Sequence, residues 1–131
     1  MRIREYTPAD QEALQQIHAA QGFAYDFPNL ANPLLVSKLI LEDADQKIAM
    51  AALARLTCEI YLLADPRHAT PRTRLVNLQT LHEIAKQDLC QRGLEDAHAW
   101  LPPKIATRFG KRLTQLGWTR DDAWTPYSIR L

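Results

Sequence analysis

The stretch "ADPRHATPRTRLV", residues 64–76, marks the passage from an expected strand into the longest expected helix, and the rest of the chain can be placed around it. Thr70 followed by Pro71 is typical of a helix start, because threonine caps the first turn and proline needs no hydrogen-bond partner there. Apolar residues then recur at helical spacing until Gly93, which predicts the end of the helix. The stretch contains three arginines and no glycine, so cations gather where the helix dipole is already positive.

Shorter elements are expected on both sides of this helix. Alternating apolar and polar residues predict strands, and capping residues followed by proline predict helices. Residues 47–56 and 58–64 are expected to form neighbouring antiparallel strands. The other expected strands are 2–6, 94–101 and 123–131, and the other expected helices are 7–22, 32–43 and 103–117. An aromatic loop, residues 23–31, joins the first two helices.

Length and composition favour one domain, residues 1–131, with a core of its own. The formal net charge of +1 gives no general attraction to nucleic acid or to an anionic membrane, so both are unlikely partners by composition. No segment approaches the ~20 apolar residues of a membrane span. Cys58 and Cys90 lack any ligand spacing and are expected to be reduced thiols. A cytoplasmic location is therefore expected.

Several classes of site are disfavoured by the absence of their motifs. The four histidines have no metal-ligand spacing, so no metal is expected. Neither serine lies in a GxSxG elbow, and no phosphate-binding P-loop or dinucleotide fingerprint is present. The cationic start of the long helix remains the clearest candidate for a binding site, here for an anion.

The C-terminal text "FGKRLTQLGWTRDDAWTPYSIRL" resembles the closing pattern of the GNAT superfamily of acyl-coenzyme A-dependent N-acyltransferases. In that pattern a helix ends at Leu-Gly-aromatic and a strand with Trp and Tyr follows. The opening "IREYTPADQEALQQIH" and the order of expected elements are similar to the same family over nearly the whole chain. The resemblance implies an α/β (α+β) fold with a mixed, mostly antiparallel central sheet flanked by about four helices.

The chain departs from this family at two places. The family has a Gln/Arg-x-x-Gly-x-Gly/Ala loop whose backbone N–H groups hold the coenzyme A pyrophosphate, whereas "RHATPRTR" has no glycine. The family also commonly has Asn, Ala and Tyr in the closing helix, the Tyr acting as general acid. Ala106, Phe109 and Leu113 stand at those positions here.

The resemblance implies acetyl-coenzyme A as co-substrate, an amine of a small molecule or peptide as acceptor, and a possible homodimer. The backbone of Leu62, Leu63 and Ala64 would direct the thioester carbonyl. Phosphate groups would meet the start of the long helix, where guanidinium forks suit bidentate phosphate contacts. The residues expected there are Arg67, Arg72, Thr73 and Arg74. The competing interpretation is a solvated face of arginines with Thr70 as a cap.

Strand residues supply the expected catalytic groups. Glu59 and Tyr61 share one face of residues 58–64 by their spacing of two. A carboxylate on this strand serves as general base in the family, and Tyr127 or Tyr61 could replace the missing acid. The alternatives are an exposed glutamate at Glu59 and a half-buried aromatic at Tyr127.

The loop over residues 23–31 would overhang the acceptor pocket in this family. Tyr25, Asp26 and Asn29 are the expected substrate-binding residues, and Asp26 could hold a cationic amine. Aromatic packing, with Phe23 and Phe27, explains the same loop without a substrate. Two functions therefore remain open: an N-acetyltransferase, and a GNAT-fold module that binds a ligand or protein without chemistry.

Overall fold

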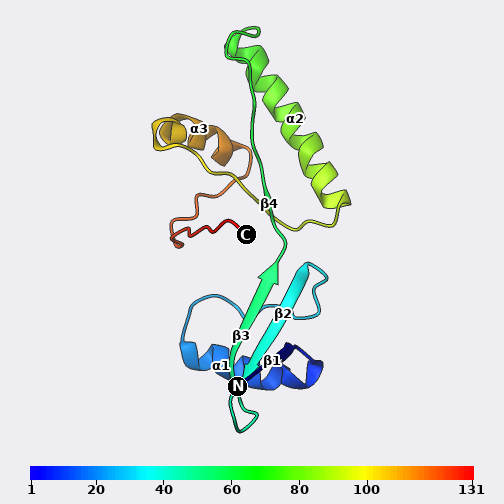
Figure 1. The fold of residues 1–131 in the computed structure, drawn as a ribbon. Coiled ribbons are helices and arrows are strands. Elements are labelled where there is room, and N and C mark those ends of the chain that lie inside the picture. Colours follow the sequence, from blue (N-terminus) through cyan, green and yellow to red (C-terminus); the bar gives the residue numbers. More distant parts are fainter. The chain divides into compact units, whose positions relative to one another are not determined.

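The computed structural model describes residues 1–131, which form two compact units, Met1–Thr57 and Cys58–Leu131 (Figure 1). We call them the N-terminal and the C-terminal unit and describe each by itself. Together they give a mixed α/β chain with three α-helices, a three-stranded antiparallel sheet and a small parallel sheet. None of the helices combines the length and the apolar composition needed to cross a membrane.

The N-terminal unit is an antiparallel sheet in the order β1-β2-β3 with one helix. The expected helix over residues 7–22 is confirmed: it begins with a 3-10 turn and ends at Gly22, whose φ of 69° is the left-handed conformation that glycine adopts without strain. The elements are β1 (Arg2–Glu5), η1 (Pro8–Asp10), α1 (Gln11–Gln21), β2 (Leu35–Glu42) and β3 (Ile48–Arg55).

The helix expected over residues 32–43 is wrong, because most of this stretch is strand β2. Asn32 does not cap a helix. Its side chain accepts a hydrogen bond from the Leu34 N–H at 2.9 Å and its carbonyl accepts one from the Leu35 N–H at 3.0 Å, which closes a turn. The strand that follows pairs with β1 on one side and β3 on the other. Pairing on both edges outweighs the weak helical signal of Pro33.

Four buried side chains form the core of the N-terminal unit: Leu14, Leu30, Leu35 and Ile40. Ile40 is completely buried, at 0% exposure, in the middle of the central strand. Half-buried apolar residues from α1, from β3 and from the loops around them surround this cluster. The core is small, so each of its side chains contributes a large share of the unit's stability.

Beside this core, Arg4 joins two buried carboxylates. Its guanidinium donates to both Asp10 carboxylate oxygens at 2.8 Å, and its Nε donates to Glu42 at 2.7 Å. Asp10 also accepts a hydrogen bond from the Thr7 N–H at 2.8 Å. The pKa of Asp10 is lowered to about 2, mainly by the hydrogen bonds from Arg4. The ion pairs thus tie β1, β2 and the start of the first helix together.

We expect Asp10 to make the N-terminal unit sensitive to acid. Its pKa falls from 3.8 in an unfolded chain to about 2 in the folded one, so protons bind the unfolded chain more readily. The stabilisation is present above about pH 4 and is lost as the pH falls through 2; it amounts to about 2 kcal/mol. Urea unfolding between pH 2 and pH 6 measures it.

Asp10→Asn should flatten the dependence of unfolding free energy on pH between 4 and 2. Asp45→Asn is the matched control, because Asp45 is an exposed turn residue without an ion pair. Equal slopes for the parent and Asp10→Asn would contradict this assignment.

The C-terminal unit contains a parallel strand pair joined by a long helix. Its elements are β4 (Cys58–Glu59), α2 (Pro71–Gln91), β5 (Ala97–His98) and α3 (Pro103–Gln115). In Figure 1 the chain leaves β4, turns into α2 and then returns past β4, the strand with which β5 pairs, on its way to α3. The start of α2 at Thr70–Pro71 is confirmed.

Strand pairing differs from the expectation for residues 47–56 and 58–64. β3 pairs with β2, and β4 pairs with β5 in parallel instead of with β3. The strands in 58–64 and 94–101 form, but only over two residues each. A parallel partner requires a crossover, which α2 supplies here.

The strand expected over residues 123–131 does not form, and residues 116–131 contain no helix or strand. Tyr127 is 94% exposed. No neighbouring strand completes a ladder with this segment, and its backbone therefore lacks the pairing that a strand needs. The flanking helices number three rather than about four, since residues 32–43 contribute β2.

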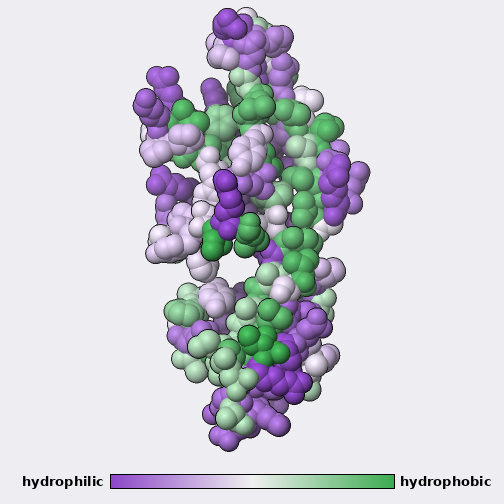
Figure 2. Space-filling model, in the orientation of Figure 1, coloured by the Kyte–Doolittle hydropathy of each residue, from purple (hydrophilic) through white to green (hydrophobic).

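The C-terminal unit has no fully buried residue. Its apolar side chains are half-buried or exposed, and Figure 2 shows hydrophobic residues on the visible surface of the molecule. Tyr61, Leu63 and Trp100 are 77%, 94% and 60% exposed, respectively. The residues around the expected site are therefore accessible.

Candidate functional site

Thr70 caps the N-terminus of α2. Its hydroxyl accepts a hydrogen bond from the Thr73 N–H at 3.2 Å, and its carbonyl accepts one from the Arg74 N–H at 2.9 Å. Thr70 also donates to the Thr73 hydroxyl at 3.0 Å. The capping interpretation of Thr70 is confirmed, and both threonines serve the helix itself in this structure.

Arg74 braces the loop in front of the helix. Its guanidinium donates to the Ala69 carbonyl at 2.9 Å and to the His68 carbonyl at 3.3 Å. Ala69 has a φ of 55°, a left-handed conformation that is strained for a residue with a Cβ. The two hydrogen bonds offset part of that strain. This contact also explains how a cation is tolerated at this end of the helix, since its charge meets carbonyl oxygens.

The other two arginines of the loop are free or weakly held. The Arg67 N–H donates to the Asp65 carboxylate at 2.9 Å, and its Nε lies 3.9 Å from the same oxygen in an exposed ion pair. The Arg72 side chain is exposed and has no hydrogen bond or ion pair. Arg72, in the first turn of α2, is therefore the arginine whose guanidinium is available to an anion.

The pairing of β4 with β5 ends where the expected coenzyme site begins. Cys58 and Glu59 pair with Ala97 and His98, and the Ile60 N–H donates to the His98 carbonyl at 2.8 Å. Beyond this point the N–H groups of residues 61–64 make no hydrogen bond. These donors, which include those of Leu62, Leu63 and Ala64, are exposed and unused.

Glu59 and Tyr61 interact as their spacing predicts. A hydrogen bond with Glu59, and secondly its negative charge, raise the pKa of the Tyr61 hydroxyl. The phenol therefore holds its proton more firmly than a free tyrosine. The pair offers a carboxylate and a neutral hydroxyl on one face of residues 58–61.

Sequence reasoning missed two residues, one in β5 and one just after it, that share this face. Residues 58–61 and 97–100 alternate between half-buried and exposed. The exposed set is Glu59, Tyr61, His98 and Trp100. The same alternation is visible in the sequence "AHAW", so a face assignment of residues 94–101 would have found His98 and Trp100.

Tyr127 and the expected acceptor residues lie elsewhere in the chain. Tyr127 is in the segment after α3, without regular structure. Tyr25, Asp26 and Asn29 belong to the N-terminal unit. Tyr25 stacks on Phe23 with ring centres 6.0 Å apart, which supports the aromatic-packing alternative for this ring.

The loop over residues 23–31 is held by further contacts of a histidine ring and an asparagine amide. The His18 ring lies edge-on to Tyr25 at 5.0 Å, and its Nε2 is 2.9 Å from the Tyr25 carbonyl oxygen. The Asn29 side chain accepts a hydrogen bond from the Ala31 N–H at 3.1 Å, which closes a turn. Asp26 is exposed, with its carboxylate unengaged.

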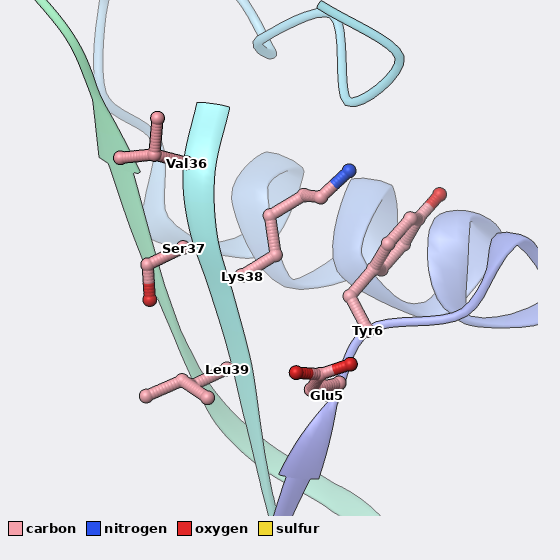
Figure 3. Close-up of a pocket in the computed structure, with 6 residues that line it drawn as sticks. All are labelled: Glu5, Tyr6, Val36, Ser37, Lys38 and Leu39. Atoms are coloured by element: carbon pink, nitrogen blue, oxygen red, sulfur yellow. The ribbon is translucent and has the colours of Figure 1, made fainter. Parts of the chain in front are cut away.

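A cavity of about 210 Å³ in the N-terminal unit lies outside this set of residues (Figure 3). Figure 3 shows the Lys38 amine beside the Tyr6 ring; the distance from Nζ to the ring centre is 5.2 Å. The same amine donates to the Leu30 carbonyl at 2.9 Å. The Lys38 amine in the cavity wall is thus already engaged by other groups of the protein. None of the expected site residues lines this cavity.

No cluster of three or more His, Cys, Asp or Glu side chains is arranged to hold a metal ion. Comparisons of the chain with models of protein families, with curated proteins and with solved structures gave no match.

Proposed function

We propose that the chain is an acetyl-coenzyme A-dependent N-acetyltransferase whose coenzyme site is in the C-terminal unit. The observation that carries the proposal is the β4–α2–β5 crossover. Two parallel strands stop pairing after Ile60, and the chain beyond it leads through unused backbone donors to the start of a long helix. Such a start attracts phosphate through its dipole and N–H groups.

The site contains a complementary group for each part of the ligand. Arg72, with its free guanidinium, meets the pyrophosphate at the start of α2. The N–H groups of residues 62–64 polarise the thioester carbonyl, where negative charge develops in the transition state. Glu59 attracts the acceptor amine, which is a cation at neutral pH. Holding amine and thioester together supplies much of the rate enhancement.

Coenzyme A should stabilise the chain against heat. Ligand at about a hundredfold over its dissociation constant adds ~2.7 kcal/mol to the unfolding free energy, enough to raise the melting temperature by several degrees. Thermal unfolding with and without millimolar acetyl-coenzyme A measures this shift. No shift at that concentration would refute the proposed function.

Arg72→Ala should weaken coenzyme A binding by at least tenfold while leaving the melting temperature of the free protein unchanged. The lost contact is a charge-assisted hydrogen bond, worth about 1.5–3 kcal/mol. Calorimetric titration gives the affinity. Arg92→Ala is the control, because this exposed arginine pairs only with Asp88 near the other end of α2. Equal affinities for Arg72→Ala and the parent would show that Arg72 is a solvated side chain with no part in binding.

The alternative, a GNAT-fold module that binds without chemistry, is favoured by Leu113. This half-buried side chain of α3 occupies the position where the family commonly has the tyrosine that acts as general acid. Leucine has no ionisable group and cannot donate a proton. Binding of coenzyme A without transfer to a panel of amines would support this alternative.

A further inference from the structure

The parallel pairing of β4 and β5 brings a second ionisable side chain next to Glu59. In the ladder Glu59 is the partner of His98, and neighbouring strands lie about 4.8 Å apart. Paired residues of a parallel ladder face the same side. The hydrogen bond from the Ile60 N–H to the His98 carbonyl, at 2.8 Å, fixes this register. A carboxylate and an imidazole therefore stand side by side on the exposed face.

The imidazole of His98 has no structural task. It is exposed and makes no hydrogen bond, ion pair or ring contact. His82 of the same unit, by contrast, accepts a hydrogen bond from the Trp118 indole at 2.9 Å. His98 thus keeps both ring nitrogens available to a ligand.

We propose that His98 is a catalytic residue that takes a proton from an ammonium group held against Glu59. This inference rests on the proposed function. Imidazole is the side chain best matched to proton transfer near neutral pH. The ionisable side chains that the ladder and the chain place next to it are Glu59 and Tyr61 on the partner segment and Glu95 and Asp96 before β5.

The same face indicates the class of acceptor. Tyr61 and Trp100 are 77% and 60% exposed, and both rings belong to the set that includes Glu59. Aromatic faces attract ammonium groups and cover apolar ones. We infer that the acceptor is a small primary amine with an apolar or aromatic body.

The proton balance of the transfer is complete with these groups. His98 removes one proton from the ammonium and later releases it to solvent. The neutral amine attacks the thioester carbonyl, forming the C–N bond as the C–S bond breaks. The proton that nitrogen must still lose passes to the departing thiolate. The products are the amide, free coenzyme A and one solvent proton.

The test compares pH–rate profiles of transfer from acetyl-coenzyme A to tyramine, benzylamine and spermidine. His98→Gln should lower kcat at least tenfold at pH 6.5 with little change in KM for the amine, and the deficit should shrink above pH 9. His82→Gln is the control: it removes an imidazole from the same unit, but its amide oxygen can still accept from Trp118. We expect its profile to match the parent's.

The outcomes separate this inference from the proposed function. A parent that transfers acetyl, with an unchanged profile for His98→Gln, overturns the role of His98 alone. A parent that binds coenzyme A but acetylates no amine refutes the proposed transfer and the role of His98 with it. Transfer to spermidine but to neither aromatic amine overturns the inferred acceptor class.

Discussion

Replacing Glu59 by Gln is expected to lower the rate of acetyl transfer at neutral pH by tenfold or more. The substitution removes the charge that attracts the ammonium while keeping the size of the side chain. A charge-assisted contact of this kind is worth about 1.5–3 kcal/mol, which corresponds to roughly tenfold or more in rate. The deficit should shrink as rising pH deprotonates the amine in solution, because a neutral amine gains little from the carboxylate.

Steady-state rates between pH 6 and pH 10 test this expectation. Glu83→Gln is the matched control, because Glu83 is an exposed residue of α2 whose only ion pair is a loose contact of 3.8 Å with Lys86. We expect Glu83→Gln to keep the parent's rate. Equal rates for Glu59→Gln and the parent at every pH would show that the carboxylate has no part in transfer.

Replacing Ile40 by Ala should destabilise the N-terminal unit by about 2–5 kcal/mol, because it deletes buried methyl groups and leaves a cavity in a close-packed site. Ile40 is the one side chain of this core at 0% exposure, and it lies on the central strand. Few neighbours can move into the space, since only four side chains form the buried cluster.

Hydrogen exchange of the β2 amides measures this loss of stability, because it reports on the N-terminal unit separately from the rest of the chain. Val36→Ala is the control on the same strand: Val36 is 59% exposed, and the expected change is within about 0.5 kcal/mol. Similar losses of protection in both variants would contradict the assignment of Ile40 as the centre of the core.

Local signals in the sequence predicted the elements that depend on local chemistry. Thr70 with Pro71 marked the start of α2, and Gly22 marked the end of α1. Elements that depend on distant partners were missed. β2 takes its conformation from pairing with two other strands, and residues 123–131 lack such a partner. Neither condition can be read from a short window of sequence.

In the candidate site, too, local relationships were predictable from the sequence and long-range ones were not. Glu59 and Tyr61 could be placed on one face because they belong to the same strand. His98 is 39 positions from Glu59 in the numbering of the chain, and only the register of β4 and β5 makes them partners. The loop arginines were found by composition, but their separation into a bracing Arg74 and a free Arg72 depends on geometry.

The brace between Arg74 and Ala69 has a consequence for how a ligand would enter. A glycine adopts a left-handed conformation without support from a side chain. In this loop the left-handed Ala69 is held by the Arg74 guanidinium, a group that phosphate can also bind. An incoming phosphate that draws Arg74 away would free Ala69 to leave its left-handed conformation. Ligand binding and relaxation of the loop would then be thermodynamically coupled, each lowering the cost of the other.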